Sequence, residues 1–308
     1  MAASYSEKRQ NESVPADSIL ARVAAKLRRD STACRLSPLV FMTDPERMPE
    51  NKFDPIDIIR RLPDPCAVIY RHFGDPKHAE GLRAITREQN RQFLIGNDPE
   101  LADRIGADGV HFSRDAKLAG PIKWREKRPD WIITMAGLKD GPYLAPLDSL
   151  DALFISSIFP SRSPSAGEAI GIDALKDRAA RLPVPIYALG GVDAGTAPQL
   201  IGSGAAGLAA IEGLIMDVRK EDTKAGHRFV IKTEAGEAEL TMAKVRDNVF
   251  NANHTFTPAA LRGQGVAGKL YAAMVADAKE NGYKIIPGCP YIEVKFKRNP
   301  ADRAAVGV

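Results

Sequence analysis

The stretch that decides the fold of the C-terminal part is RGQGVAGKL, residues 262–270. Its glycines fit the pattern G-x-G-x-x-G, its later part fits G-x-x-x-x-G-K, and its start fits R-x-x-G-x-A. All three patterns use the same physics, in which exposed main-chain N–H groups at the N-terminus of a helix face a phosphate group. The surrounding residues therefore have to decide which phosphate-binding fold is present.

Two of these patterns fail on the residues that follow. A dinucleotide-binding fold needs an acidic residue about 20 positions after the glycines, at the end of the next strand. The next predicted strand, KIIPG (284–288), is followed by Cys289, and the chain after Gly268 is too short for further strand–helix units. A triphosphate-binding loop needs a Ser or Thr after its lysine to hold Mg²⁺, and Leu270 stands there. The pattern R-x-x-G-x-A remains.

The wider sequence supports the remaining pattern. HTFTPAALRGQGVAGKL (254–270) and KIIPGCPYI (284–292) resemble the segments H-T-x-V-P-x-x-L-R-G-x-G-[IV]-[AG] and K-[VI]-x-P-x-C-[PS]-[FY] of minimal N-acetyltransferases in the GNAT superfamily. The resemblance covers residues 228–303 and implies an α+β fold that uses acetyl-CoA to acetylate an amine or a peptide. It also implies which residues hold the coenzyme pyrophosphate: Arg262, Gly263, Gln264, Gly265, Val266, Ala267 and Gly268.

The same resemblance suggests residues for acyl transfer. Cys289 stands where a family cysteine is suspected of carrying the acetyl group, although a free cysteine is often a small buried apolar residue. His254 is a candidate base, or else a structural histidine, and Phe256 replaces the family's acid two residues on. Three basic residues are expected either to meet the 3′-phosphate of coenzyme A or to form a solvated face: Lys295, Lys297 and Arg298.

The part of the chain between Ser37 and Ile215 alternates short apolar runs with longer, charged, helix-patterned pieces. The runs are rich in Val, Ile, Leu and Phe without polar alternation, as parallel strands covered on both faces should be. They predict eight strands: 38–43, 66–70, 92–96, 108–112, 131–136, 152–159, 185–190 and 205–211. With helical crossovers, these strands predict an N-terminal (β/α)₈ TIM barrel of the α/β class. A capped amphipathic helix, DSILARVAAKLRR (17–29), precedes it.

The composition of the sequence changes after the last of these runs. Residues 216–226, MDVRKEDTKAG, are polar and lack apolar periodicity, which predicts a linker. Beyond them, antiparallel strands are followed by a helix, a strand and a short helix, which is an α+β order. The predicted division is a tail and helix at 1–36, the barrel at 37–215, the linker at 216–226 and a GNAT-like domain at 227–308.

The barrel sequence resembles the thiamine phosphate synthase/TenI family over residues 37–214. Three segments carry most of the resemblance. They are LIGNDPELADRIGADGVHF (94–112), similar to L-I-N-D-R-x-D-L-A-x-x-x-G-A-D-G-V-H; ISSIFPSRSPSAG (155–167), similar to G-P-[VI]-F-P-T-x-T-K; and VPIYALGGV (184–192), similar to P-[VI]-x-A-I-G-G-[IV]. Family members join an aminopyrimidine diphosphate to a thiazole phosphate with Mg²⁺, or aromatise the thiazole. The resemblance therefore implies a phosphorylated small-molecule ligand in the barrel.

The catalytic set of that family is only partly present. The loop after the second strand keeps Arg71 alone, which is the one catalytic candidate of the barrel. Asn97 stands where the first metal-binding aspartate belongs, with Asp98 one residue later, and Asp115 lies one residue before the second position. These three residues are the candidate Mg²⁺ ligands. A pyrophosphate-releasing reaction without paired metal carboxylates loses its main electrostatic support.

The phosphate-binding positions are better kept. Ser161 and Ser163 supply the hydroxyls of the pyrophosphate-binding segment, although its lysine is missing. Gly190 and Gly191 form the first half of the phosphate site that barrels of this kind build from their last two loops. Glu212 stands where a serine would help to bind phosphate, and its charge should repel one.

The bulk composition excludes several kinds of function. A net charge of +4 on 308 residues is too small for a nucleic-acid binder, and the whole excess lies in residues 227–308. Cys34, Cys66 and Cys289 form no C-x-x-C pair, so a reducing cytoplasm is expected rather than a disulfide framework or a zinc site. Because no apolar run approaches the length of a membrane span, no membrane partner is expected.

Three hypotheses about function follow. The protein is a bifunctional transferase; or its barrel is a non-catalytic scaffold or ligand binder that presents substrate to a working acetyltransferase; or both halves act only by binding partners. The intact coenzyme loop favours the first two hypotheses over the third. Fold alone does not choose between the first two.

Overall fold

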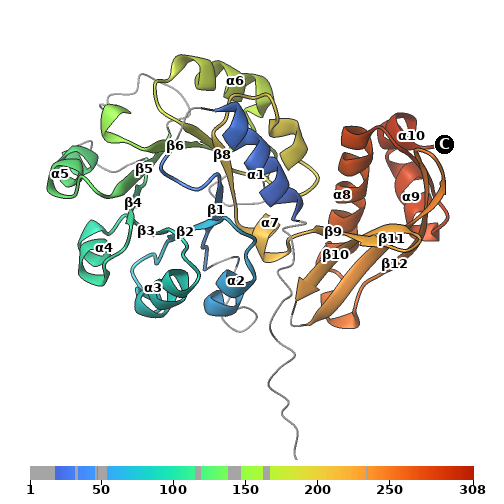
Figure 1. The fold of residues 1–308 in the computed structure, drawn as a ribbon, viewed down its shortest axis with the longest axis horizontal. Helices are drawn as coiled ribbons and strands as arrows, with labels where there is room; N and C mark the ends of the chain where they lie inside the picture. The colour runs from blue at the N-terminus through green and yellow to red at the C-terminus, as the bar shows by residue number, and fades with distance from the viewer. Residues whose placement is uncertain are drawn as a thin grey trace, which may run out of the picture.

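The structure, a computed structural model, describes residues 18–31, 34–45, 47, 54–114, 119–137, 147–161, 167–233 and 235–308. The predicted N-terminal tail lies outside this set up to residue 17. Figure 1 shows a barrel formed by the N-terminal two thirds of the chain and, beside it, a domain of sheet and helices formed by the remainder. None of the described helices combines the length and the apolarity that crossing a bilayer requires.

The barrel is a closed ring of eight parallel strands, which confirms the predicted fold. Each predicted apolar run contains one strand, because nearly every strand residue is buried and has to be apolar. β1 pairs with both β2 and β8, and this closes the ring. The strands are β1 (Leu39–Met42), β2 (Ala67–Tyr70), β3 (Phe93–Gly96), β4 (Gly109–Phe112), β5 (Ile132–Ala136), β6 (Ala152–Ile155), β7 (Ile186–Ala188) and β8 (Gly207–Ala210).

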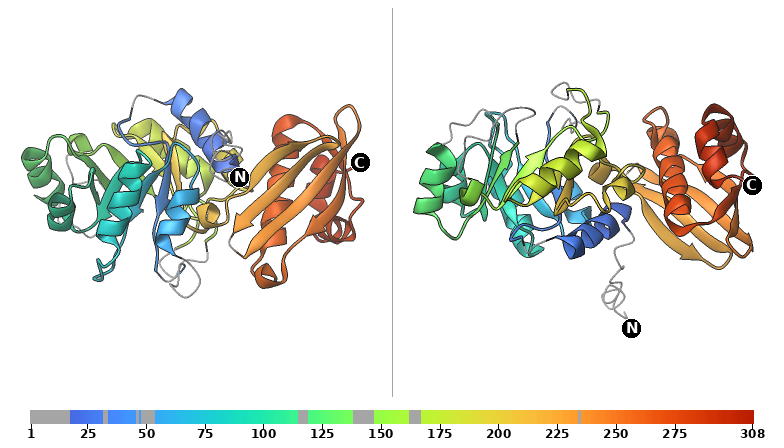
Figure 2. Two further views of the ribbon diagram at one scale, coloured as in Figure 1. Left: turned by 60° about the horizontal axis from the view of Figure 1, so that its bottom comes forward. Right: turned by 90° about the horizontal axis from the view of Figure 1, so that it is seen from above.

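Helices surround this ring, as Figure 2 shows. The α-helices are α2 (Pro55–Arg61), α3 (Ala79–Glu88), α4 (Pro99–Ile105), α5 (Ala119–Lys127), α6 (Gly171–Arg181) and α7 (Glu212–Ile215). Two 3₁₀ helices complete the set, η1 (Leu147–Ser149) and η2 (Ala197–Leu200). The carboxyl ends of all eight strands therefore face the same way, and this is the end of such a barrel that carries ligand sites.

The predicted helix in front of the barrel is present as α1 (Ile19–Asp30). Ser18 caps it, because the Ser18 hydroxyl accepts a hydrogen bond from the Ala21 N–H at 3.2 Å; Asp17, the predicted first residue, lies outside the described residues. The fully buried side chains of Leu20 and Val23 belong to the apolar face, and α1 lies against β1, β8 and η2.

The second domain is a five-stranded sheet in the order β13-β12-β11-β10-β9, with helices packed on one face (Figure 2). β12 and β13 are parallel, and the other neighbours are antiparallel. The strands are β9 (Arg219–Thr223), β10 (Gly226–Thr233), β11 (Gly236–Arg246), β12 (Val249–Phe256) and β13 (Lys284–Ile286). The helices are η3 (Ala259–Leu261), α8 (Val266–Asn281), α9 (Pro290–Arg298) and α10 (Pro300–Val306). This arrangement confirms the predicted α+β class.

The predicted linker at 216–226 is wrong at its centre, because Arg219–Thr223 form the edge strand β9. A strand at a sheet edge with polar residues on both faces lacks the apolar periodicity by which a strand is predicted from sequence. Ion pairs with β10 stabilise β9 instead: Glu221 accepts hydrogen bonds from Arg228 and Lys232 of β10, each at 2.6 Å. Helix α10 is a further element that the apolar pattern does not predict.

Buried polar contacts join the two domains in addition to the chain itself. Asp277 of α8 is 1% exposed and accepts hydrogen bonds from Arg22 of α1 at 3.0 Å and from Lys220 of β9 at 2.6 Å. The Ser18 hydroxyl donates to Asp217 at 2.8 Å. Because α1 also packs on the barrel, these contacts determine which face of α8 meets the barrel.

Candidate functional site

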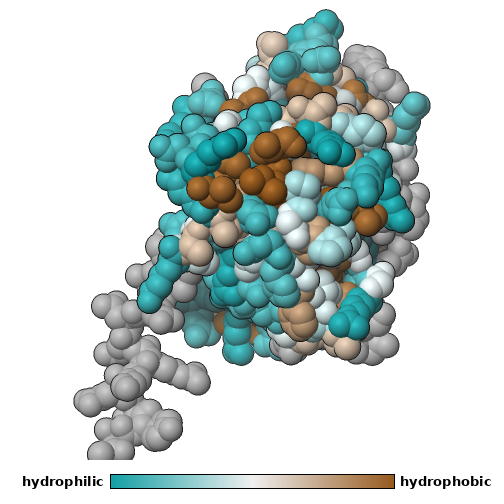
Figure 3. Space-filling view, turned by 90° about the vertical axis from the view of Figure 1, so that its right-hand side faces the viewer, coloured by the Kyte–Doolittle hydropathy of each residue, from teal (hydrophilic) through white to brown (hydrophobic). Residues whose placement is uncertain are grey.

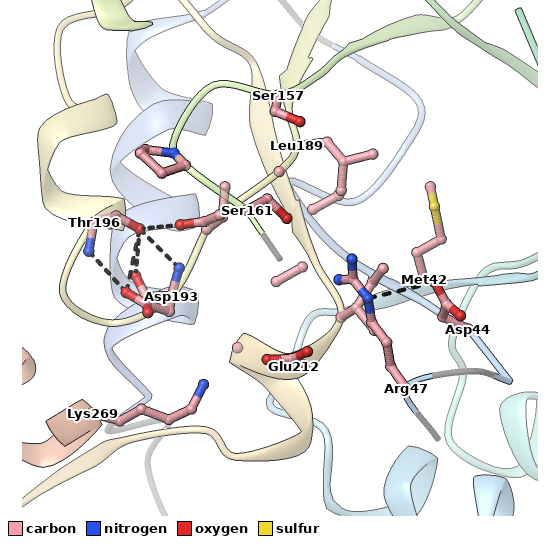
Figure 4. A pocket seen from close by; sticks show the side chains of 18 of the residues that line it. Met42, Asp44, Arg47, Ser157, Ser161, Leu189, Asp193, Thr196, Glu212 and Lys269 are labelled. Carbon is pink, nitrogen blue, oxygen red and sulfur yellow. Dashed lines mark hydrogen bonds and ion pairs between the residues drawn. The ribbon is translucent and has the colours of Figure 1, made fainter. Parts of the chain in front are cut away.

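A cavity of about 520 Å³ lies at the carboxyl ends of the barrel strands, where the barrel meets the second domain. Its wall comes from the loops after β1, β2, β6, β7 and β8 and from helices α8 and α9 of the second domain (Figure 4). Sites for small molecules usually have volumes of about 300–1,000 Å³. The cavity is therefore the candidate ligand site, and two domains build it.

The loop after β7 brings bare main chain to the cavity surface. Gly190 and Gly191 have φ values of 91° and 66°, in the left-handed region that favours glycine. A Cβ atom on Gly190 would lie 2.8 Å from the Cβ of Ser157, and one on Gly191 would lie 2.5 Å from the carbonyl oxygen of Pro160. Both residues line the cavity, as a phosphate-binding pair should.

The loop after β6 adds hydroxyl groups beside these glycines. Ser157 and Ser161 both line the cavity, and Figure 4 shows them on the barrel side of it. Ser157 is 4% exposed, and its hydroxyl has no hydrogen-bond partner within the described part of the chain. Ser163, predicted together with Ser161, lies outside the described residues.

Arg71, after β2, is held as a fixed cation on the cavity wall. Its Nη2 donates to Asp44 Oδ2 at 3.0 Å, and its Nε donates to the Thr43 carbonyl at 2.8 Å. The Nε of Arg47 lies 3.7 Å from the same Asp44 carboxylate. Burial lowers the pKa of Arg71, and the neighbouring Asp44 opposes this effect. A guanidinium anchored in this way suits anion binding rather than proton transfer.

Two further carboxylates of the barrel lie at the cavity. Asp193 accepts hydrogen bonds from the N–H groups of Gly195 at 2.9 Å and Thr196 at 3.1 Å, so it closes its own turn. Glu212, the first residue of α7, is exposed and has no hydrogen bond or ion pair to any described residue. Figure 4 shows Glu212 between Lys269 and Arg47. Its free negative charge therefore faces the space that a phosphate would enter.

The predicted coenzyme loop precedes α8 and reaches the same cavity. Gly263 and Gly265 both have a φ of 76°, and a Cβ atom on either would meet no atom within 4 Å. Among the described residues, none accepts a hydrogen bond from the main-chain N–H groups of residues 263–268. Gln264, Gly265 and Gly268 line the cavity. The loop is an open row of unpaired donors at the positive end of a 16-residue helix.

Two lysines flank this row of donors. Lys269 of α8 and Lys295 of α9 line the cavity, and neither forms an ion pair with a described carboxylate. Lys295 Nζ lies 5.5 Å from the ring centre of Tyr271 and 5.8 Å from that of Tyr291, which holds the ammonium group between two aromatic faces. The second domain thus presents two uncompensated cations to the barrel.

Other residues predicted for the coenzyme contribute less to the cavity. The Arg262 Nε donates to the Thr257 carbonyl at 3.3 Å, and the Arg262 residue is exposed. Lys297 pairs with Glu293 at 2.7 Å, so of the three predicted basic residues only Lys295 lines the cavity. Val266 is buried under the loop, Ala267 follows it in the first turn of α8, and Arg298 is exposed.

The two predicted metal ligands that the structure describes, Asn97 and Asp98, are engaged in local contacts. Asn97 Oδ1 accepts a hydrogen bond from the Ser113 N–H at 2.6 Å, and Asp98 caps α4 by accepting one from the Leu101 N–H at 2.8 Å. Neither residue lines the cavity, and Asp115 lies outside the described residues. The described ranges hold no group of three His, Cys, Asp or Glu side chains able to bind a metal ion. The predicted Mg²⁺ site is not supported, because Asn97 and Asp98 serve local structure instead.

The two acyl-transfer candidates lie outside the cavity lining. Cys289 is the N-cap residue of α9, is 8% exposed, and donates its N–H to the Ala252 carbonyl of β12 at 2.8 Å. His254 is exposed on β12 and lies opposite Thr241 of β11. No hydrogen bond between described residues joins the two side chains. Their roles in acyl transfer stay predictions.

The side of the second domain that faces away from the barrel carries apolar side chains on an otherwise polar surface, as Figure 3 shows. The exposed large apolar residues of this domain are Val245, Phe256, Val294 and Val308. Phe256, in the position of the family's acid, is 46% exposed. The carboxylate that would raise the basicity of His254 is therefore replaced by an accessible ring.

Sequence reasoning missed four residues of the site: Asp44, Arg47, Ser157 and Lys269. For Asp44 and Ser157 a signal exists, because both follow an apolar strand at the barrel end that carries ligand sites. Lys269 is the lysine of the rejected pattern G-x-x-x-x-G-K. That it faces the barrel depends on how the two domains pack, which no local pattern contains.

Comparison with known families matches each half of the chain separately. Residues 228–305 match the family described as GCN5-related N-acetyl-transferase. Residues 76–214 match the family described as thiamine monophosphate synthase. The second match begins after the loop that carries Arg71 and therefore does not include that loop.

Curated relatives match the part of the chain that forms the barrel. The thiamine-phosphate synthase of Moorella thermoacetica is 30% identical over 136 residues, which cover 44% of this chain and 64% of that protein. The synthase of Chlorobium phaeovibrioides is 31% identical over 135 residues, 43% of this chain and 64% of that protein. The chain thus spans slightly less than two thirds of the length of these relatives.

Solved structures align with each half. A GCN5-like protein of Staphylococcus aureus is 30% identical, covers 29% of this chain and 87% of its own, and has a TM-score of 0.25. A thiamine phosphate pyrophosphorylase of Pyrococcus furiosus is 20% identical, covers 63% and 89%, and has a TM-score of 0.46. The chain joins a thiamine phosphate synthase/TenI-like barrel to a GNAT-like domain, and each part is similar to a family of transferases.

Proposed function

We propose that the protein is an acetyl-CoA-dependent N-acetyltransferase whose coenzyme loop is residues 262–268. The observation that carries the proposal is the row of unpaired N–H groups at the N-terminus of α8. A pyrophosphate suits them, because a helix N-terminus attracts anions and each hydrogen bond to a charged group contributes about 1.5–3 kcal/mol. The match of residues 228–305 to an acetyltransferase family supports the same ligand.

The charges around the loop support an anionic ligand as well. Lys269 and Lys295 stand beside the free amides without carboxylate partners among the described residues. Two neighbouring ammonium groups without counter-ions repel each other, and a bound phosphate relieves this repulsion. The loop therefore gains both hydrogen bonds and charge neutralisation from a pyrophosphate.

Acyl transfer requires an amine to attack the thioester carbonyl and a group to accept the proton that the amine releases. His254 is accessible on β12 and suits the second task. In an alternative route, the Cys289 thiolate attacks the thioester, coenzyme A leaves as its thiol, and the amine then takes the acetyl group from the cysteine. Cys289→Ala should abolish transfer in the cysteine route and leave the turnover number within about twofold in the direct route, because removal of a non-reacting group changes the barrier little.

The barrel suits ligand binding better than metal-dependent synthesis. Gly190, Gly191, Ser161 and Arg71 all line the cavity. The residues nearest to the metal positions, of which Asp98 is the cap of α4, are engaged in local structure. We therefore assign the barrel a phosphorylated small-molecule ligand, or part of one, in the service of the acetyltransferase.

Calorimetric or thermal unfolding of the full chain with acetyl-CoA tests the proposal. A ligand at 100 times its Kd stabilises the folded state by about 2.7 kcal/mol. Arg262→Glu should remove this stabilisation, because its carboxylate would repel the pyrophosphate at the start of the loop. Arg246→Glu is the matched control, since Arg246 is also exposed but ends β11 and does not line the cavity.

The outcomes separate the hypotheses. If the wild-type protein shows no stabilisation at millimolar acetyl-CoA, the acetyltransferase proposal is wrong. The bifunctional hypothesis is tested by complementation of a strain that lacks thiamine phosphate synthase. Growth would show that the barrel keeps synthase activity, and failure with well-expressed protein would support a binding role.

A further inference from the structure

The two phosphate-binding elements of this chain share one cavity. The Gly190–Gly191 loop belongs to the barrel and the 263–268 loop belongs to the second domain, yet residues of both line the same 520 Å³. The two domains are in direct contact there: a Cβ atom placed on Gly195 would lie 2.7 Å from the Cβ of Ala272 on α8. No wall therefore separates the coenzyme loop from the barrel mouth.

The barrel side of this cavity holds an unused hydrogen-bonding group. Ser157 is 4% exposed, lines the cavity, and has no hydrogen-bond partner in the described ranges. A buried hydroxyl without a partner is costly unless a ligand or water meets it. Its Cβ lies next to the bare backbone of Gly190, so hydroxyl and main chain face the same space.

The charges of the cavity favour an anion that is attracted mainly from the α8 side. Lys269 and Lys295 stand on the α8 side without counter-ions, while Arg71 and Arg47 on the barrel side share the single carboxylate of Asp44. Asp193, the next barrel carboxylate, is occupied by the N–H groups of its own turn. With Glu212 as a further carboxylate of the barrel, the excess positive charge lies on the α8 side, while the barrel side offers its guanidinium groups, the bare backbone of Gly190 and the Ser157 hydroxyl.

The direction of the coenzyme follows from which residues line the cavity. The cavity is lined by Gln264, Gly265 and Gly268 of the pyrophosphate loop. It is not lined by the acyl-transfer candidates Cys289 and His254. With the pyrophosphate on the loop, the thioester arm points away from the barrel, and the other end of the molecule is on the cavity side. That end is an adenosine with a phosphate on its 3′ oxygen.

We propose that the nucleotide end of coenzyme A lies in the mouth of the barrel, with its 3′-phosphate against Gly190, Gly191 and the Ser157 hydroxyl. This inference rests on the proposed acetyl-CoA binding, and it makes the barrel a wall of the coenzyme site. It explains why the phosphate-binding glycines are kept in a barrel whose metal-ligand residues are not: the phosphate that they bind belongs to the coenzyme.

Titration calorimetry of the full chain with coenzyme A and with 3′-dephospho-coenzyme A tests the placement. A hydrogen bond to a charged phosphate contributes enough that wild-type protein should bind coenzyme A at least about tenfold more tightly than the dephospho form. In Ser157→Ala this ratio should fall at least about threefold, because the variant loses one of the bonds to the 3′-phosphate. Its affinity for the dephospho form should not change.

A second variant tests the same placement with the opposite sign. Glu212→Gln removes the free negative charge of the cavity and should tighten coenzyme A binding about two- to tenfold, with a smaller gain for the dephospho form. Glu212 is exposed and unpaired among the described residues, so its loss should not disturb folding. Glu88→Gln is the matched control, because Glu88 is also exposed but ends α3 at the opposite end of the barrel.

The results distinguish the placement of the 3′-phosphate from the proposed acetyltransferase function on which it rests. If coenzyme A binds but neither Ser157→Ala nor Glu212→Gln changes the ratio of the two affinities, the placement of the 3′-phosphate in the barrel is wrong and the acetyltransferase proposal stands. An equal gain for both ligands in Glu212→Gln also overturns that placement. If neither form of the coenzyme binds to wild-type protein, both proposals fall.

Discussion

Asp217 should make the folded state less stable as the pH rises. The residue is 9% exposed, and its carboxylate accepts a hydrogen bond from Ser18 at 2.8 Å and lies 3.7 Å from the Nε of Arg219. Burial raises the pKa of Asp217 to about 7, although Ser18 and Arg219 oppose the rise. In the unfolded chain the pKa of an aspartate is about 3.9. The folded state therefore binds the proton more tightly than the unfolded state does.

The sign and size of the effect follow from this difference. A raised folded-state pKa gives stabilisation that is complete below about pH 4 and is lost as the pH rises through about 7. Three pH units at about 1.4 kcal/mol each give a total of about 4 kcal/mol. Between pH 5 and pH 8 the expected loss is about 3 kcal/mol, because part of the change occurs below pH 5.

Asp217→Asn removes the titrating group and keeps an oxygen that can accept from Ser18. Urea unfolding of both proteins at pH 5 and pH 8 gives the difference in free energy of unfolding at each pH. This difference should move by about 3 kcal/mol in favour of the variant on going from pH 5 to pH 8. His111 and His227, whose pKa values burial lowers to about 3 and about 4, titrate in both proteins and cancel.

Asp222→Asn is the control for this experiment, because Asp222 is an exposed aspartate of β9, the strand that begins two residues after Asp217. Its difference from wild type should stay constant between the two pH values. A difference for Asp217→Asn that is also the same at pH 5 and pH 8 would refute the reasoning. The carboxylate would then be ionised in the folded state as freely as in the unfolded chain.

Two other substitutions test the packing of the domains and of the site. Asp277→Ala should lower the free energy of unfolding by about 2–4 kcal/mol in denaturant titrations, because it removes the buried carboxylate that Arg22 and Lys220 share at the domain junction, although Arg22 keeps Glu280 nearby. Gly190→Ala should cost about 2–5 kcal/mol in the same assay, since it combines a positive φ with a contact of 2.8 Å to Ser157. Gly202→Ala, which has a positive φ but open space around it, should cost only about 1–2 kcal/mol, and equal losses would contradict the steric argument.

Local patterns were enough to predict the barrel because each of its strands is buried on both faces. Burial forces strands such as Leu39–Met42 to be apolar throughout, and the sequence shows this directly. β9 escapes prediction for the opposite reason, since its side chains are held by ion pairs at a sheet edge. The glycine loop before α8 was predictable because helix entry and glycine positions are local properties, whereas its binding of a coenzyme stays a prediction.

The predicted metal site lacks support for a different reason. An aspartate that caps a helix and an aspartate that binds a metal have the same letter in the sequence. Asp98 is followed by Pro99 and Glu100, which is the pattern of a helix start, and this favours the cap that the structure has. The shared cavity could not be predicted at all, because it depends on contacts such as that of Arg22 with Asp277, 255 residues apart.

The position of α1 determines which residues have to be kept together when the C-terminal domain is moved to another protein. The helix belongs to the N-terminus, yet Arg22 and Lys26 form ion pairs with α8 of the C-terminal domain. A fusion of residues 227–308 to another protein would lack both the ion pairs with α1 and the strand β9. Cutting the gene where the composition changes would therefore yield two fragments with exposed seams, and a transplant that keeps the GNAT-like domain intact has to include residues 18–30 and 217–223.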